Sequence, residues 1–117
     1  MKMILLIIPS DRLNELMDDL DEQQLHGLTV SEARGFGQND RDFTDVEMAP
    51  KLRIEMVCHD EEVETLLNAV YQSVHTGQRG DGKIFILPVE DALRIKTGER
   101  GAAAVGPVYP APKGPKE

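Results

Sequence analysis

The sequence predicts an α+β fold of the ferredoxin-like type, in which one antiparallel sheet carries two helices on one of its faces. Two observations support this class. The order strand, helix, strand occurs twice along the chain, and a duplicated βαβ unit is the pattern of a ferredoxin-like sandwich. The length of 117 residues fits a single domain with a modest core. The two repeats are therefore expected to form one domain.

The first repeat begins with the apolar run 3–8, which a proline ends, as is typical of a strand covered on both faces. Ser10 offers an N-cap for the helix that follows. Apolar residues at helical spacing then alternate with acids, and this helix is expected to end near Gly27. The segment 28–37, LTVSEARGFG, is predicted to be the second strand.

The second repeat has the same order. Apolar side chains alternate along 52–58, which predicts a strand with one buried face. Asp60 can cap the next helix, whose apolar stripe extends to Val74. Gly77 is expected to end that helix, and the run 84–89 is predicted to be the fourth strand.

The predicted sheet has an uncovered face. Helices would lie on one side only, although the first strand is apolar on both sides. Aromatic residues make up 4% of the chain and tryptophan is absent, so the core must consist of leucine, isoleucine, valine and methionine. We expect the uncovered face to pack against further subunits.

The chain divides into a folded domain, 1–100, and a tail, 101–117. The tail is rich in proline and glycine and is expected to be flexible. Within the domain, the polar connection 38–49 is too long for a hairpin turn and has no apolar period. Such loops are usually functional or disordered.

Charge and targeting signals narrow the class of protein. The net charge is −8, which opposes a nucleic-acid surface but permits a local pocket for a small anion. The apolar run near the N-terminus is too short to span a membrane and lacks a signal-peptide cleavage pattern. We therefore expect a cytoplasmic protein. The single cysteine, Cys58, fits a reducing compartment and a buried, unreactive thiol.

The stretch 77–83, GQRGDGK, fits the spacing of a phosphate-binding P-loop. That motif needs Ser or Thr after the lysine and a helix that begins there. Here Ile84 follows, and the next segment resembles a strand. Two interpretations remain: a turn between helix and strand, or a nest of glycine amides beside a lysine that binds an anion. The residues concerned are Gly80, Asp81, Gly82 and Lys83.

Two more cations favour the second interpretation. Arg94 and Lys96 are two residues apart, so they would lie on the same side of an extended segment. Together with Lys83, they predict a site for a polyphosphate.

Several ordered motifs resemble one family. The segments 76–89, TGQRGDGKIFILPV, and 93–99, LRIKTGE, are similar to the C-terminal signatures of the PII signal-transduction proteins, and GLTVSEARGFG and PKLRIE agree in the N-terminal half. The resemblance covers residues 2–99. It implies a homotrimer that binds ATP, ADP or AMP in clefts between subunits. It also implies a T-loop, here 38–49, that docks onto a transporter, an enzyme or another regulated protein, in a sensor that is not an enzyme.

The resemblance also assigns individual residues. The nucleotide phosphates would lie near Gly80, Asp81, Gly82, Lys83, Arg94 and Lys96. The cleft would be lined by Gly35, Gly37, Gln38 and Asn39. The adenine would contact Thr29 and Glu55, with Ile7 and Val57 as apolar walls. Lys96 stands where the family more often has arginine. A lysine keeps the charge but loses the bidentate fork, which is expected to weaken triphosphate recognition.

The effector site departs further from the family pattern. Asn39 stands where the family has a glutamine implicated in binding Mg²⁺ and 2-oxoglutarate, whereas Lys51 matches the lysine that pairs with the oxoacid carboxylate. The T-loop is shorter than usual and contains no tyrosine, which excludes uridylylation of the enteric kind. An alternative is therefore an inorganic-carbon sensor that binds bicarbonate with ADP or AMP and is associated with carboxysomes or bicarbonate transport.

Other classes have less support. His26, His59 and His75 show no ligand spacing, so ordinary histidines are preferred to a metal site. The acids of the loop 38–49 lack EF-hand spacing. Two rivals to the sensor remain, a slow nucleotide hydrolase that uses the same cleft and a structural trimer whose cleft no longer binds.

Overall fold

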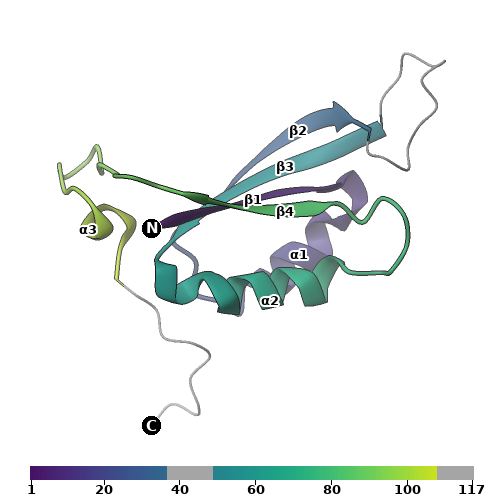
Figure 1. Ribbon diagram of the computed structural model, residues 1–117, viewed down its shortest axis with the longest axis horizontal. Helices are drawn as coiled ribbons and strands as arrows, with labels where there is room; N and C mark the ends of the chain where they lie inside the picture. Colours follow the sequence, from purple (N-terminus) through teal and green to yellow (C-terminus); the bar gives the residue numbers. More distant parts are fainter. Residues whose placement is uncertain (37–48, 108–117) are drawn as a thin grey trace, which may run out of the picture.

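The structure, a computed structural model, describes residues 1–36 and 49–107. It shows the predicted α+β fold, a four-stranded antiparallel sheet in the order β2-β3-β1-β4, with α1 and α2 on one face (Figure 1). The strands are β1 (Lys2–Pro9), β2 (Thr29–Gly35), β3 (Ala49–Cys58) and β4 (Lys83–Pro88). Of the predicted functional positions, Gly37, Gln38, Asn39 and nearly all of the loop 38–49 lie outside the described residues.

Each main helix begins with a single 3₁₀ turn. The turn η1 (Ser10–Arg12) precedes α1 (Leu13–Leu20), and η2 (Asp60–Glu62) precedes α2 (Val63–Val74). Ser10 and Asp60 therefore lie inside the first turns, and the prediction that they are N-caps is wrong. Pro9 and His59 hold those positions.

The helix α1 is shorter than the sequence suggests. It ends at Leu20, well before Gly27. The last turn and the residues after it carry the acids Asp18, Asp19, Asp21 and Glu22. Carboxylates at a helix C-terminus oppose the macrodipole, which gives a physical reason for the early end.

The core lies between the sheet and the two helices. Alternate residues of β1 and β3 point into it, as predicted, and α1 and α2 add their apolar stripes. Its fully buried members include Ile4, Leu6, Ile8, Leu16, Leu20, Ile54, Met56, Cys58 and Val70. Cys58 is thus a core residue, in agreement with the sequence prediction.

Among residues 1–36 and 49–107, no helix lies over the other face of the sheet (Figure 1). The strand register brings apolar side chains together there, because directly paired residues of antiparallel strands share a face. Leu5 pairs with Phe85, and Met3 pairs with both Leu87 and Val57. Phe85 is 47% exposed. We call this set, Met3, Leu5, Ile7, Val57, Phe85 and Leu87, the open apolar face.

Folded structure continues past residue 100, where the sequence predicts the flexible tail to begin. A bridge joins Leu93 to Arg100, and the one-turn helix α3 (Ala102–Val105) follows. The contacts that hold residues 101–107 in place include the bond from Arg94 Nε to the Ala104 carbonyl at 3.3 Å. His59 Nε2 also lies 2.7 Å from the Gly106 carbonyl. Within the described residues, every helix is too short or too polar to cross a membrane.

Candidate functional site

The turn before β4 is ordered by one carboxylate. Asp81 accepts backbone N–H groups of Thr76 and Gly77, both at 2.9 Å, and the Thr76 hydroxyl. The hydroxyl bond and these amide bonds hold the pKa of Asp81 below its ordinary value. Its carboxylate thus faces the turn's own donors, so Asp81 orders the turn and is poorly suited to contact a phosphate directly.

Gly82 makes the closest backbone approach in this turn. Its φ is +107°, and a Cβ built on it would lie 2.1 Å from the backbone oxygen of Ile7. Only glycine fits there without a shift of β1 or of the turn. Lys83 follows at the start of β4, where it pairs with Ile7. The turn therefore holds Lys83 beside β1.

Five of the predicted nucleotide residues share the uncovered face of the sheet. They are Thr29, Glu55, Val57, Ile7 and Lys83. Thr29 pairs with Glu55 across β2 and β3, and Val57 lies two positions further along β3 on the same side. Glu55 in turn pairs with Leu5 of β1, and Ile7, two positions further along β1, pairs with Lys83 of β4. Gly35 ends β2 opposite Ala49. The Glu55 carboxylate accepts a hydrogen bond from Arg53 Nε at 3.0 Å. Arg53 adds a cation to this face that sequence reasoning did not assign.

Arg94 and Lys96 are placed differently from the prediction. The segment is not extended: residues 95–97 form a turn, and Gly98 donates its N–H to the Arg94 carbonyl at 2.7 Å. The argument that spacing puts both cations on one side is therefore wrong. The whole of β4 also separates this segment from Lys83, so one chain alone does not bring the three predicted phosphate ligands together.

Two hollows lie at the end of the sheet where β4 begins. The larger, about 630 Å³, is lined by Ser10, Glu32, Arg34, Lys51 and neighbouring residues. The smaller, about 260 Å³, is lined by residues from α2 and the turn, among them Tyr71, His75, Asp81 and Lys83. Lys51, the predicted effector residue, thus borders a hollow large enough for a small carboxylate.

The structure also forms a cluster that sequence reasoning missed. His59 and Glu62 flank the turn η2, His26 comes from a distant segment, and one ligand atom of each lies within 4.8 Å of the others. No short motif links His26 to the other two, because it is 36 positions from Glu62. Spacing along the chain offers the pair His59 and Glu62, three positions apart, but could not have revealed that His26 joins them.

Comparison with known proteins identifies the family. The chain matches the family "Nitrogen regulatory protein P-II" over residues 1–99. It is 42% identical to the nitrogen regulatory protein P-II of Azospirillum brasilense and 42% identical to that of Rhodospirillum rubrum, in each case covering 90% of this chain and 100% of the relative. It is 41% identical to nitrogen regulatory protein P-II 2 of Methanothermobacter thermautotrophicus, over 90% of this chain and 97% of that one. The chain belongs to the P-II family, whose members are signal-transduction proteins rather than enzymes.

Proposed function

We propose that this protein binds adenine nucleotide in clefts between the subunits of a homotrimer and, through the loop 38–49, regulates a partner such as a transporter or an enzyme. One observation carries the proposal. The predicted phosphate ligands lie at opposite ends of β4, with Lys83 at its start and Arg94 and Lys96 beyond its end. The sheet face between them is uncovered and apolar. A second copy can supply the missing half of the site.

The open apolar face favours assembly. Burial of apolar surface stabilises by roughly 25 cal/mol per Å², so a face of six apolar side chains gains from contact with another subunit. A head-to-tail contact of this kind forms a closed ring when its rotation closes. Such a ring would place the 93–100 segment of one subunit near the glycine turn that precedes β4 in the next subunit.

The chemistry of the completed cleft suits a nucleotide phosphate. Gly80 and Gly82 both have positive φ, and glycines in such turns can direct backbone N–H groups at an anion. Lys83 would neutralise charge from one subunit, and Arg94 and Lys96 from the next. The adenine would lie against Ile7 and Val57, with Thr29 and Glu55 as polar partners. Phosphate number would then be recognised by cations from two chains.

A second anion would act at the base of the loop. Lys51 and Arg34 border the larger hollow, which suits a carboxylate such as 2-oxoglutarate, bound with Mg²⁺, or alternatively bicarbonate beside ADP or AMP. Bound ligand would favour one arrangement of the loop 38–49, which requires different affinities for its two states. Gly35 and Gly37 would absorb the change in backbone angles.

Calorimetric titration tests the nucleotide proposal. The protein is titrated with ATP, ADP and AMP, each alone, with Mg²⁺ and 2-oxoglutarate, and with bicarbonate, while light scattering gives the mass. We expect a trimer that binds nucleotide. A rise in ATP affinity with 2-oxoglutarate indicates a nitrogen and carbon sensor, whereas coupling only between bicarbonate and ADP or AMP indicates an inorganic-carbon sensor. A monomer, or a trimer that ignores all three nucleotides, would contradict the proposal.

Mixed assemblies test whether the cleft needs two chains. Lys83→Ala and Arg94→Ala should each abolish tight binding in a pure trimer. When the two variants are unfolded, mixed in equal amounts and refolded, about one cleft in four should again combine an intact Lys83 with an intact Arg94. Recovery of that fraction supports the shared cleft, and no recovery in trimers of confirmed mixed composition contradicts it. Phosphate release above background with saturating ATP would instead support the hydrolase.

A further inference from the structure

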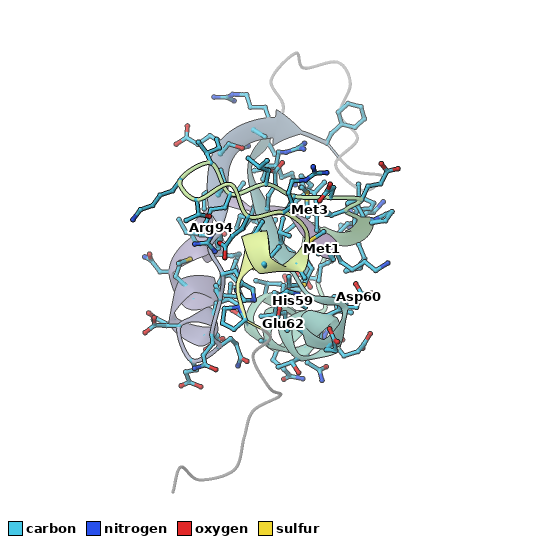
Figure 2. The ribbon with its side chains drawn as sticks, turned by 90° about the vertical axis from the view of Figure 1, so that its left-hand side faces the viewer. Met1, Met3, His59, Asp60, Glu62 and Arg94 are labelled. Atoms are coloured by element: carbon cyan, nitrogen blue, oxygen red, sulfur yellow. The ribbon has the colours of Figure 1, made fainter. Side chains whose placement is uncertain are left out.

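At the far end of the sheet from Lys83, two imidazoles and a carboxylate meet in a buried cluster. His26 lies between α1 and β2, His59 follows β3, and Glu62 ends the turn η2. The side chains of His26 and Glu62 are 6% and 5% exposed. Figure 2 shows His59 and Glu62 beneath the short helix α3. Charged or titratable groups are rarely buried to this extent unless they are paired or bind a metal.

The pairing of His26 with Glu62 has the geometry of a shared cation. His26 Nε2 lies 3.0 Å from both carboxylate oxygens of Glu62. A single N–H can point well at only one oxygen, whereas a metal ion between the ring and the carboxylate can be approached by both. Tetrahedral zinc, with Zn–N and Zn–O bonds near 2.1 Å, holds its ligand atoms about 3.4 Å apart. The observed separation therefore needs to open only slightly.

His59 is held in the orientation of a metal ligand. Its Nε2 lies 2.7 Å from the Gly106 carbonyl, which can only accept, so Nε2 is the donor and Nδ1 the acceptor of this ring. Nδ1 faces the backbone N–H of Glu62 in the capping box of η2, and a metal ion would take the place of that hydrogen bond. Metal-binding histidines usually donate their second N–H to a carbonyl or carboxylate in this way. The His59 ring stands edge-on to the His26 ring, with centroids 5.2 Å apart. Since the donor atoms lie within 4.8 Å of one another, His59 would move by at most about 1.4 Å to complete a tetrahedral site.

The backbone around the cluster keeps it in place. The His59 N–H donates to the Glu62 carboxylate at 2.8 Å, which fixes that side chain across the start of η2. Gly106 has a φ of +128°, and a Cβ on it would lie 2.9 Å from His26 Nδ1. The C-terminal segment therefore packs directly over the His26 ring.

We propose that His26, His59 and Glu62 bind one divalent transition-metal ion per chain, with Zn²⁺ as the first ion to test. Two imidazoles and a carboxylate form a ligand set that Zn²⁺ takes in proteins, with a fourth position for water. The site is separate from the proposed nucleotide cleft, so its test does not depend on nucleotide binding.

The test uses untagged protein freed of metal by a chelator. Zn²⁺ is titrated by calorimetry, and Co²⁺ replaces it for visible spectroscopy, because the intensity of its bands reports tetrahedral coordination. We expect one ion per chain. His26→Gln and Glu62→Gln should each weaken binding by at least about tenfold, whereas His75→Gln should bind like the unaltered protein because His75 lies outside the cluster. Binding that survives both cluster substitutions, or that His75→Gln removes, would overturn the proposal.

A measurement on the unaltered protein guards against variants that fail to fold. The chain contains three histidines, so its imidazole NMR signals are few, and the His75→Gln variant identifies one of them. Addition of Zn²⁺ should shift the signals of His26 and His59 but leave that of His75 in place, and a chelator should reverse the shift. Signals that do not respond, or a response of His75 alone, would show that the cluster is only a set of buried hydrogen bonds.

Discussion

The two ends of the sheet are built from contacts of very different range. Where β4 begins, the turn is closed by bonds from Asp81 to residues four and five positions away. At the opposite end, His26 meets Glu62 across 36 positions, His59 meets Gly106 across 47, and the Met1 amine meets Asp60 across 59. Bonds between residues close in sequence hold the turn before β4, whereas bonds between residues distant in sequence hold the opposite end. Substitutions at the two ends are therefore expected to have different effects.

The largest effect should come from the near end, at Gly82. Alanine there would meet the Ile7 carbonyl and would have to adopt a positive φ, so Gly82→Ala should destabilise by about 3 kcal/mol. Gly80→Ala is the matched control. Its φ is +85° but open space surrounds it, and it should cost about 1 kcal/mol. Urea unfolding measures both, and equal losses would contradict a steric role for Gly82.

At the far end, the Cys58 thiol should resist labelling. Burial, and after it the Glu62 charge, raises the pKa of Cys58 from 9.0 to about 11. The thiolate is the reactive form, and a rise of two pKa units lowers its population about a hundredfold at neutral pH. With a chelator present, a disulfide reagent should therefore react at least about a hundredfold more slowly with folded than with unfolded protein. Equal rates would mean that this end opens readily.

The metal site should also be coupled to the nucleotide cleft. A metal ion on His59 would fix Gly106, and the same segment holds Arg94 through the Ala104 carbonyl at 3.3 Å. If both proposals hold, Zn²⁺ should raise nucleotide affinity by about fivefold, and nucleotide should raise Zn²⁺ affinity by the same factor. Paired titrations measure both factors. Unequal factors would reveal an experimental fault, and factors of one would mean that the metal site and the nucleotide cleft act independently.

The smallest effect should be a local loss of order with acid. The pKa of Asp81 is lowered by its bonds to Thr76 and Gly77. Its stabilising effect is therefore complete above the ordinary value of 3.8 and is lost as the pH falls through the lower, folded value. Asp81→Asn should speed hydrogen exchange at the Thr76 and Gly77 amides at neutral pH. Asp91→Asn, which removes a carboxylate bonded to Arg100 and Ala92, should leave those amides unchanged.

Sequence reasoning performs best where contacts are local or periodic. The alternation of Leu52, Ile54 and Met56 correctly predicts a strand with one buried face, because side-chain direction follows directly from backbone period. The same reasoning identifies the glycine turn before β4. It also predicts the uncovered apolar face, since two helices can cover only one side of a sheet.

It performs worst where distant segments determine the local structure. The two-residue spacing of Arg94 and Lys96 predicts that their side chains lie on the same side of a strand. The segment instead forms a turn, which the bond from the Gly98 N–H to the Arg94 carbonyl closes. Likewise, His26 and His59 appear unrelated until the fold brings their rings within 5.2 Å. The predicted N-caps Ser10 and Asp60 are each wrong by one residue, because a 3₁₀ turn precedes each helix and begins one residue earlier.

Because of the uncovered apolar face, the apparent nucleotide affinity is expected to depend on the concentration of the protein itself. If two chains share each cleft, nucleotide binds only to assembled chains, so mass action links the two equilibria. Dilution then lowers apparent affinity without any change in the cleft, and ligand in turn promotes assembly. A cell that makes more of this chain would thereby alter the threshold at which it responds.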